Sequence, residues 1–176
     1  MDEEPLPVPT LALNYAVENN ESPTNLFQFG LSPEEEARQV AERTWVDGHV
    51  HAAVVVPTGP WGERVYQAFK ERWEFMGGKI VVSQSYDSTK NDFSEPLKTM
   101  LDIDKSRSRY VQLSRTLKKP VKYTPRRRMD IDFIFLAAFP KQARAIRPQL
   151  KFFHASDVPV YATSHIFTGN INQEKD

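Results

Sequence analysis

The sequence contains no cysteine, which excludes disulfide bonds, thiolate metal sites and a cysteine nucleophile. It has no apolar run approaching the roughly 20 residues that a membrane-spanning helix needs. Its first residues, MDEEPLPVP, lack the basic and apolar regions of a signal peptide. These absences predict either a cytosolic protein or a processed or trimmed fragment of a longer one.

Familiar catalytic and nucleotide-binding motifs are also missing. The turn Thr58-Gly59-Pro60-Trp61-Gly62 follows an apolar run, but it lacks the Lys-Ser/Thr pair of a P-loop and the spacing G-x-G-x-x-G. Free amides at the start of the next helix are able to receive an anion. The sequence favours a structural interpretation, in which Gly59-Pro60 makes the bend, Trp61 packs at the sheet edge and Gly62 permits a close helix approach.

Histidine and paired carboxylates give no catalytic site either. His49 and His51 form an H-x-H pattern, but no H-E-x-x-H motif or suitably spaced carboxylate accompanies it. Asp130 and Asp132 flank Ile131 at the amino end of an expected parallel strand, whereas sites in such sheets gather at the carboxyl ends. No G-x-S-x-G motif is present. We therefore expect loop or surface histidines, solvated aspartates, no metal site, no cofactor and no enzymatic activity.

Charges of the two signs are unevenly distributed along the chain. The totals cancel, with 23 basic and 23 acidic residues, but residues 1–48 hold ten acids and two bases. Residues 105–128 hold ten bases and no acid, together with Tyr110 and Tyr123. The simplest interpretation of this basic segment is a solvent-exposed helix face. A contact with an acidic protein or an anionic polymer is the main alternative, and base stacking on nucleic acid is the least favoured.

Hydrophobic periodicity predicts alternating strands and helices. We expect strands, the first of them buried, over 10–15, 51–57, 79–86, 131–139 and 158–167, and helices over 33–48, 60–76, 93–117 and 140–154. Ser32 and Pro33 are a typical helix start. This order predicts an α/β, Rossmann-like fold with a mostly parallel sheet and helices on both faces.

The segments WGERVYQAF, after a strand, and RRRMDIDFIFLAAFPKQAR are the most specific parts of a resemblance to the C-terminal domain of the LppC/LpoA lipoproteins, which covers about residues 8–170. It implies one lobe of a type I periplasmic-binding-protein fold over 10–170. Within it, 10–24 would be a strand and linker from a first lobe outside this chain, and 105–130 a basic helix end and loop. An acidic, proline-rich lead (1–9) and a polar tail (171–176) flank the lobe.

The resemblance implies a non-enzymatic protein of the periplasm, attached to the outer membrane through a lipid anchor outside this chain. Its implied role is to activate a class A penicillin-binding protein in peptidoglycan synthesis, with peptidoglycan as an open second partner and no nucleic acid. We expect part of the partner interface to comprise Arg115, Lys118, Lys119, Arg126, Arg127 and Arg128.

Two other functions stay open. The first is a solute-binding lobe for a small polar ligand, such as an amino acid or a cell-wall fragment. In binding proteins of this fold the strand-to-helix turns of the second lobe face the cleft, which makes cleft candidates of Thr58, Gly59, Trp61, Tyr86, Asp87 and Phe139. The second is a cytosolic flavodoxin-like enzyme, for which the sequence offers no catalytic group.

Overall fold

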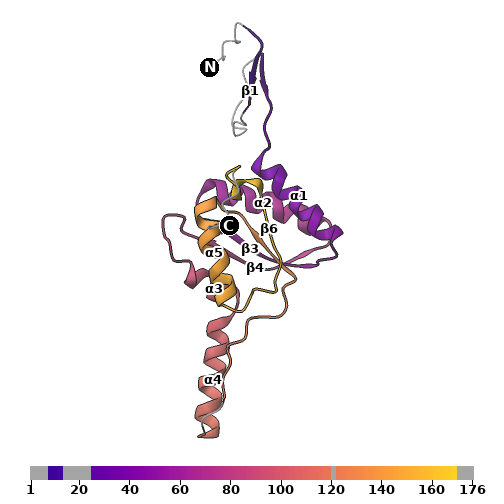
Figure 1. The fold of residues 1–176 in the computed structure, drawn as a ribbon. Helices are drawn as coiled ribbons and strands as arrows, with labels where there is room; N and C mark the ends of the chain where they lie inside the picture. Colours follow the sequence, from indigo (N-terminus) through magenta and orange to yellow (C-terminus); the bar gives the residue numbers. More distant parts are fainter. Residues whose placement is uncertain (1–7, 14–24, 120–121, 170–176) are drawn as a thin grey trace.

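The computed structural model describes residues 8–13, 25–119 and 122–169, and their centre is a four-stranded parallel sheet. The strands lie in the order β4 (Lys79–Tyr86), β3 (His51–Pro57), β5 (Phe133–Leu136) and β6 (Val160–Ala162) (Figure 1). Because all of them run in the same direction, their carboxyl ends meet along one edge of the sheet.

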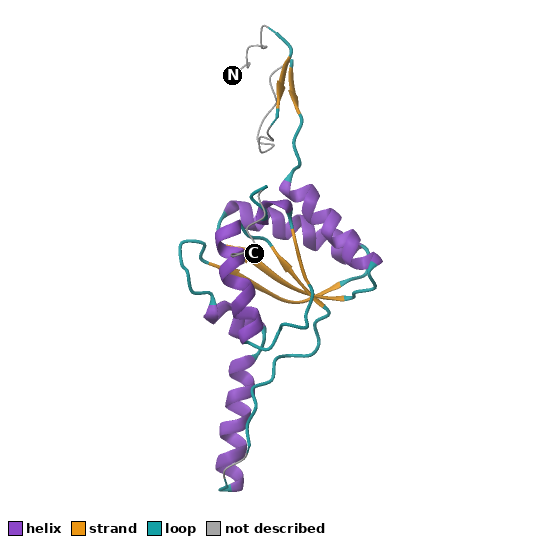
Figure 2. Ribbon diagram, viewed as in Figure 1, coloured by secondary structure: helices purple, strands orange, loops and turns teal. Residues whose placement is uncertain are grey.

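Helices cover both faces of this sheet (Figure 2). One face carries α1 (Pro33–Val46) and α2 (Pro60–Phe75), and the other carries α3 (Ser94–Met100) and α5 (Pro140–Phe152). The side chains of β3 alternate between the two resulting cores. Val54 and Val56 pack with α1 and α2, whereas Ala53 and Val55 pack with α3 and α5. The expected α/β sheet with helices on both faces is confirmed.

Local signals account for the helix boundaries. The side chain of Ser32 accepts a hydrogen bond from the backbone N–H of Glu35 at 3.4 Å, and Pro33 occupies the first helical turn of α1. Pro60 and Pro140 begin α2 and α5 in the same way. Gly48 follows α1 with a φ of 87°, a left-handed conformation that suits glycine at a helix end. The predicted starts of these helices are therefore correct.

Two short strands lie apart from the main sheet. β1 (Thr10–Ala12) and β2 (Leu26–Gln28) pair in parallel with each other and extend away from the body of the molecule (Figure 1). The predicted strand is present, but the prediction that it is buried is wrong, because Leu11 is 62% exposed. Residues 1–7 of the lead, 14–24 of the linker and the whole 171–176 tail lie outside the described residues.

The single helix predicted over 93–117 is wrong, because the structure divides it into α3 and α4 (Ile103–Leu117). The break is at Asp102, whose φ of 57° is left-handed. The carbonyl oxygen of Leu101 accepts a hydrogen bond from the backbone N–H of Arg128 at 2.9 Å, and that oxygen would otherwise serve the next turn of a continuous helix. A contact with a distant segment therefore ends α3, and α4 leaves the body in a new direction (Figure 1).

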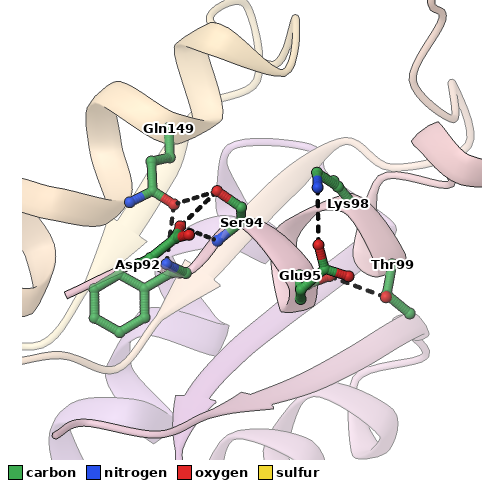
Figure 3. Close-up of polar contacts among 7 residues, drawn as sticks. Asp92, Ser94, Glu95, Lys98, Thr99 and Gln149 are labelled. Carbon is green, nitrogen blue, oxygen red and sulfur yellow. Dashed lines mark hydrogen bonds and ion pairs between the residues drawn. The ribbon is translucent and has the colours of Figure 1, made fainter. Parts of the chain in front are cut away.

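Polar contacts hold the start of α3 against α5 (Figure 3). The side-chain oxygen of Gln149 accepts a hydrogen bond from the backbone N–H of Phe93 at 3.1 Å. The Asp92 carboxylate accepts hydrogen bonds from the backbone N–H and the hydroxyl of Ser94 at 2.9 and 2.5 Å. One turn later, the ammonium of Lys98 contacts the Glu95 carboxylate at 2.8 Å. The hydrogen bond between Phe93 and Gln149 therefore anchors α3, the element that precedes α4, to α5.

The last predicted strand is shorter than expected. Only Val160–Ala162 pairs with β5, and a short 3-10 helix, η1 (Ser164–Ile166), follows it. The carboxylate of Glu36 in α1 accepts hydrogen bonds from the backbone N–H of Ser164 at 2.7 Å and from its hydroxyl at 2.6 Å. These two hydrogen bonds hold Ser164 against α1, and the chain therefore turns away from the sheet at the end of β6.

Candidate functional site

An aromatic cluster lies at the carboxyl edge of the sheet, built from the turns that follow three different strands. The rings of Trp61 and Phe139 are stacked, with centroids 4.9 Å apart and an interplanar angle of 28°. His165 completes the cluster, 5.5 Å from Trp61 and 6.0 Å from Phe139. Two of the predicted cleft residues, Trp61 and Phe139, are therefore in contact. His165 is not among the predicted cleft residues, because the sequence predicts only loop or surface positions for the histidines.

The turn beneath this cluster is tightly constrained. A Cβ atom on Gly62 would lie 1.9 Å from the carbonyl oxygen of Pro57, so glycine is required where α2 approaches the end of β3. Gly59 has a φ of 110° and initiates α2 without a side-chain cap. The exposed Thr58 donates its backbone N–H to the carbonyl oxygen of Tyr86 at 2.8 Å. The turn therefore has the predicted structural role and also presents Trp61 at the edge.

Buried polar groups support the same edge. Glu36 is buried beneath η1, and its Oε2 lies 3.7 Å from Nδ1 of His165. Thr163 is also buried, and its hydroxyl oxygen has no hydrogen-bond partner among the described residues. Glu36 thus fixes the position of the turn that carries His165. No sequence motif signals this, because Glu36 and Ser164 are 128 positions apart.

The predicted cleft residues at the end of β4 have other roles. Tyr86 is buried, and its hydroxyl donates a hydrogen bond to the carbonyl oxygen of Ala137 at 2.9 Å. Burial raises the pKa of the Tyr86 phenol. The prediction that Tyr86 faces a cleft is therefore wrong, since its side chain points into the core. The Asp87 carboxylate accepts hydrogen bonds from the hydroxyl and backbone N–H of Thr89, which lower its pKa and stabilise the local turn.

The paired carboxylates at the opposite edge stabilise loops. Oδ2 of Asp132 accepts the backbone N–H groups of Val50 and His51 at 2.9 and 2.8 Å, which joins the starts of β3 and β5. Asp130 forms a two-point contact with the Arg128 guanidinium, at 2.7 and 2.8 Å. These carboxylates are therefore hydrogen-bonded rather than merely solvated. In the part of the chain that the structure describes, no group of three or more acidic or histidine side chains is placed to hold a metal ion.

The predicted basic interface divides into buried and exposed parts. Only 8% of the Arg127 side chain is exposed, because it donates hydrogen bonds to Asp157 and to the backbone carbonyl of His154. Arg128 is 16% exposed and is held by Asp130. These two arginines stabilise the lobe, so the expectation that they lie in an open partner surface does not fit the geometry.

The other four predicted interface residues, Arg115, Lys118, Lys119 and Arg126, are exposed. Arg115 belongs to α4, Lys118 and Lys119 directly follow it, and Arg126 belongs to the segment 122–126. This segment returns beside the helix (Figure 1). Tyr110 and Tyr123 stack between the helix and this segment with ring centroids 4.5 Å apart. The tertiary structure thus gathers this part of the basic block onto one projecting element.

Comparison with solved structures places this architecture in the class of periplasmic-binding-protein-like lobes. A type 1 periplasmic binding protein from Bordetella pertussis superposes with a TM-score of 0.56 at 15% identity, over 81% of this chain and 31% of that one. The C-domain of LpoA from Haemophilus influenzae, described as a regulator of PBP1A, superposes with a TM-score of 0.54 at 23% identity, over 89% and 40% of the two chains. These likenesses establish the fold.

The sequence establishes the family. Residues 2–176 match the family described as LppC putative lipoprotein, and the chain belongs to that family. The penicillin-binding protein activator LpoA of Vibrio vulnificus is 30% identical over 142 residues, which are 80% of this chain and 23% of that protein. The chain therefore spans about a quarter of the length of the curated relatives it matches. The family and fold implied by the sequence resemblance are confirmed.

No helix within residues 8–13, 25–119 and 122–169 is long and apolar enough to cross a bilayer.

Proposed function

We propose that this chain is part of a periplasmic lipoprotein, attached to the outer membrane, that activates a class A penicillin-binding protein in peptidoglycan synthesis. The observation that carries the proposal is its similarity to relatives named penicillin-binding protein activator, one of which matches 80% of this chain. The fold supports it, since the described lobe resembles the C-domain of a protein described as a regulator of PBP1A.

The proposed activity is non-enzymatic. An activator needs only to bind the active conformation of its target more tightly than the inactive one, and that difference in affinity sets the shift in population. The polar groups at both edges of the sheet are consistent with this role, because Glu36, Asp87, Asp130 and Asp132 each accept hydrogen bonds that hold loops in place. The family, described as a putative lipoprotein, provides the expectation of a lipid anchor.

The test is to measure binding and peptide crosslinking together. This chain, and the longer protein of which it forms part, are each mixed with purified class A penicillin-binding protein at low and at moderate salt. We expect saturable binding and a higher rate of crosslinking with at least the longer protein. If neither binds and crosslinking is unchanged by both, the proposed function is wrong.

A second candidate function is binding of a small polar ligand at the carboxyl edge of the sheet. The observation that favours it is the Trp61–Phe139–His165 cluster, in which Phe139 remains 46% exposed. The exposed Thr58 and Gly59 shortly precede Trp61 in the chain. Aromatic surface with a few convergent polar groups is typical of ligand sites.

Thermal unfolding of a protein that carries both lobes, against a panel of amino acids and cell-wall fragments, tests this function. A ligand at 100 times its dissociation constant adds about 2.7 kcal/mol of stability. We expect Trp61→Ala to abolish such a shift, and replacement of the exposed Phe152 with alanine to leave it unchanged. The absence of a shift with every compound would reject the function.

A further inference from the structure

We propose that α4 and the segment that returns beside it form a docking arm, defined here as residues 103–119 and 122–126, for an acidic and partly apolar surface of a protein. The inference rests on the proposed function, and the surface is accordingly assigned to the penicillin-binding protein. It goes further by identifying which part of this lobe makes the contact and what chemistry the partner must present.

The arm carries an unusual number of unpaired positive charges. In the part of the chain that the structure describes, seven exposed basic side chains of the arm form no ion pair with a carboxylate: Arg107, Arg109, Arg115, Lys118, Lys119, Lys122 and Arg126. The acids of α4 and its N-cap, Asp102 and Asp104, lie at the end nearest the body. Repulsion among these charges opposes their clustering, and an acidic partner surface would relieve it.

The arm projects from the body, which makes it accessible. Ser106 is the only buried residue of α4, and the remainder of the helix extends beyond the lobe (Figure 1). The helix has 15 residues, so its length is about 22 Å. Its base is held by the Leu101–Arg128 backbone hydrogen bond and by the hydroxyl of Ser106, which accepts the backbone N–H of Arg126 at 3.3 Å. The arm is therefore an anchored projection.

Apolar side chains lie among these charges. Val111, Leu113 and Leu117 are 37%, 49% and 52% exposed. Arginine beside exposed apolar surface is characteristic of protein–protein interfaces, whereas a purely anionic polymer would leave the leucines uncovered. The two tyrosines of the arm are stacked on each other, so those stacked faces are not presented to nucleic-acid bases or sugar rings. These features favour a protein surface.

A second copy of this chain is a poor occupant. The acids of α1 and its C-cap already have partners: Glu34 contacts Arg64, Glu35 contacts Arg38, Glu36 contacts Ser164, Glu42 contacts Arg72 and Asp47 contacts Arg43. Every carboxylate of α1 and its C-cap is therefore held by a partner within the same copy, so this helix offers no free acidic group to the arm of a second copy. Charge complementarity points to a different protein.

Two charge-matched variants test the arm. The first reverses Arg115, Lys119 and Lys122 to glutamate. The second, the control, reverses Lys79, Lys141 and Arg147, which are exposed bases of the body with no ion pair in the described structure. Each changes one arginine and two lysines. Binding to purified class A penicillin-binding protein is measured at low and moderate salt, in the longer protein, after circular dichroism and thermal unfolding show that each variant is folded.

We expect the arm variant to bind at least about tenfold more weakly at low salt and to lose most of its salt dependence, with the control unchanged. Leu113→Ser with Leu117→Ser should weaken binding several-fold without altering the salt dependence. Suppose that the unaltered protein binds, and that the arm charge variant and the Leu113→Ser, Leu117→Ser variant both bind as tightly as it does. The proposed docking arm is then wrong, while the proposed function stands. If the unaltered protein does not bind, the proposed function itself fails.

Two other outcomes overturn the assignment of the partner. The first is binding to vesicles containing phosphatidylglycerol that the arm variant loses, with binding to the penicillin-binding protein retained, which would make the occupant a lipid surface. The second is self-association that only the arm variant loses, measured by analytical ultracentrifugation, with binding to the penicillin-binding protein again retained. That result would make the occupant a second copy.

Discussion

The guanidinium of Arg127 donates a hydrogen bond to the carboxylate of Asp157, a residue 30 positions further along the chain, with Nη2 and Oδ2 2.5 Å apart. The same side chain donates to the backbone carbonyls of Arg128 and His154, at 2.7 and 3.1 Å. It thereby joins the segment that returns from α4 to the loop that follows α5. A basic residue within a basic block is thus part of the internal structure.

Replacement of Arg127 with alanine should destabilise the lobe. The change removes several hydrogen bonds from a largely buried guanidinium, so we expect the free energy of unfolding to fall by about 2 kcal/mol. Urea denaturation measures this. The neighbouring Arg126→Ala is the control, because Arg126 is exposed and should change stability by less than about 0.5 kcal/mol. Equal effects of the two substitutions would contradict the assigned difference between these side chains.

Gly62→Ala should be severely destabilising despite its conservative chemistry. The added methyl group would lie 1.9 Å from the carbonyl oxygen of Pro57, which belongs to the central strand and has little freedom to move. We expect a loss of at least about 2 kcal/mol in chemical denaturation. Glu63→Ala, one residue later on the exposed side of α2, serves as the reference and should be close to neutral. Comparable stability of both variants would show that α2 does not approach β3 this closely.

Substitutions at Asp102 distinguish a broken helix from a continuous one. Because Asp102 has a φ of 57°, glycine should be tolerated there or raise stability by up to about 1 kcal/mol, whereas valine should lower it by about 1–2 kcal/mol. In a continuous helix the order would reverse, since glycine in a helix interior costs about 1 kcal/mol. Thermal unfolding of both variants therefore tests the break. The contact of Asp102 with the exposed Lys105 contributes little to either result.

The Arg128–Asp130 contact should appear in the acid limb of the stability profile. The hydrogen bond from Arg128 lowers the pKa of Asp130 to about 2. Because this folded-state pKa lies below the ordinary value of about 3.9, the ionised carboxylate favours the folded state. The contribution of the Asp130 carboxylate to the free energy of unfolding is complete at pH values above its pKa in the unfolded state. It is lost as the pH falls through its pKa in the folded state. The effect is modest, because 59% of the Asp130 side chain is exposed to solvent.

Carboxyl chemical shifts followed by NMR titration measure this pKa directly. Arg128→Ala should return the pKa of Asp130 toward its ordinary range, and stability should then depend less on pH in the acid limb. Replacement of Lys90, an exposed base after β4, with alanine should leave the titration of Asp130 unchanged. An unchanged pKa in Arg128→Ala would contradict the assigned cause.

The sequence by itself determined the order of the main elements and the layered α/β architecture. Ser32, Pro33, Pro60 and Pro140 specify helix starts through contacts within a few residues. The short continuous apolar run 51–57 is typical of a strand buried on both faces, as the structure shows. Gly62 was also identified from its position, because a glycine soon after a strand permits a close helix approach. These properties depend on local geometry and periodicity, which a sequence carries explicitly.

Only the tertiary structure decided which residues meet across the fold. The break after α3 coincides with the hydrogen bond from the backbone N–H of Arg128 to the carbonyl of Leu101. Tyr86 points inward, where its hydroxyl donates to the carbonyl of Ala137. Glu36 holds the turn that places His165 next to Trp61. Each of these contacts joins segments far apart in sequence. The sequence gives the composition of the basic block, but only packing divides it into the largely buried Arg127 and Arg128 and the exposed docking arm. The burial of a side chain depends on which other parts of the chain lie against it.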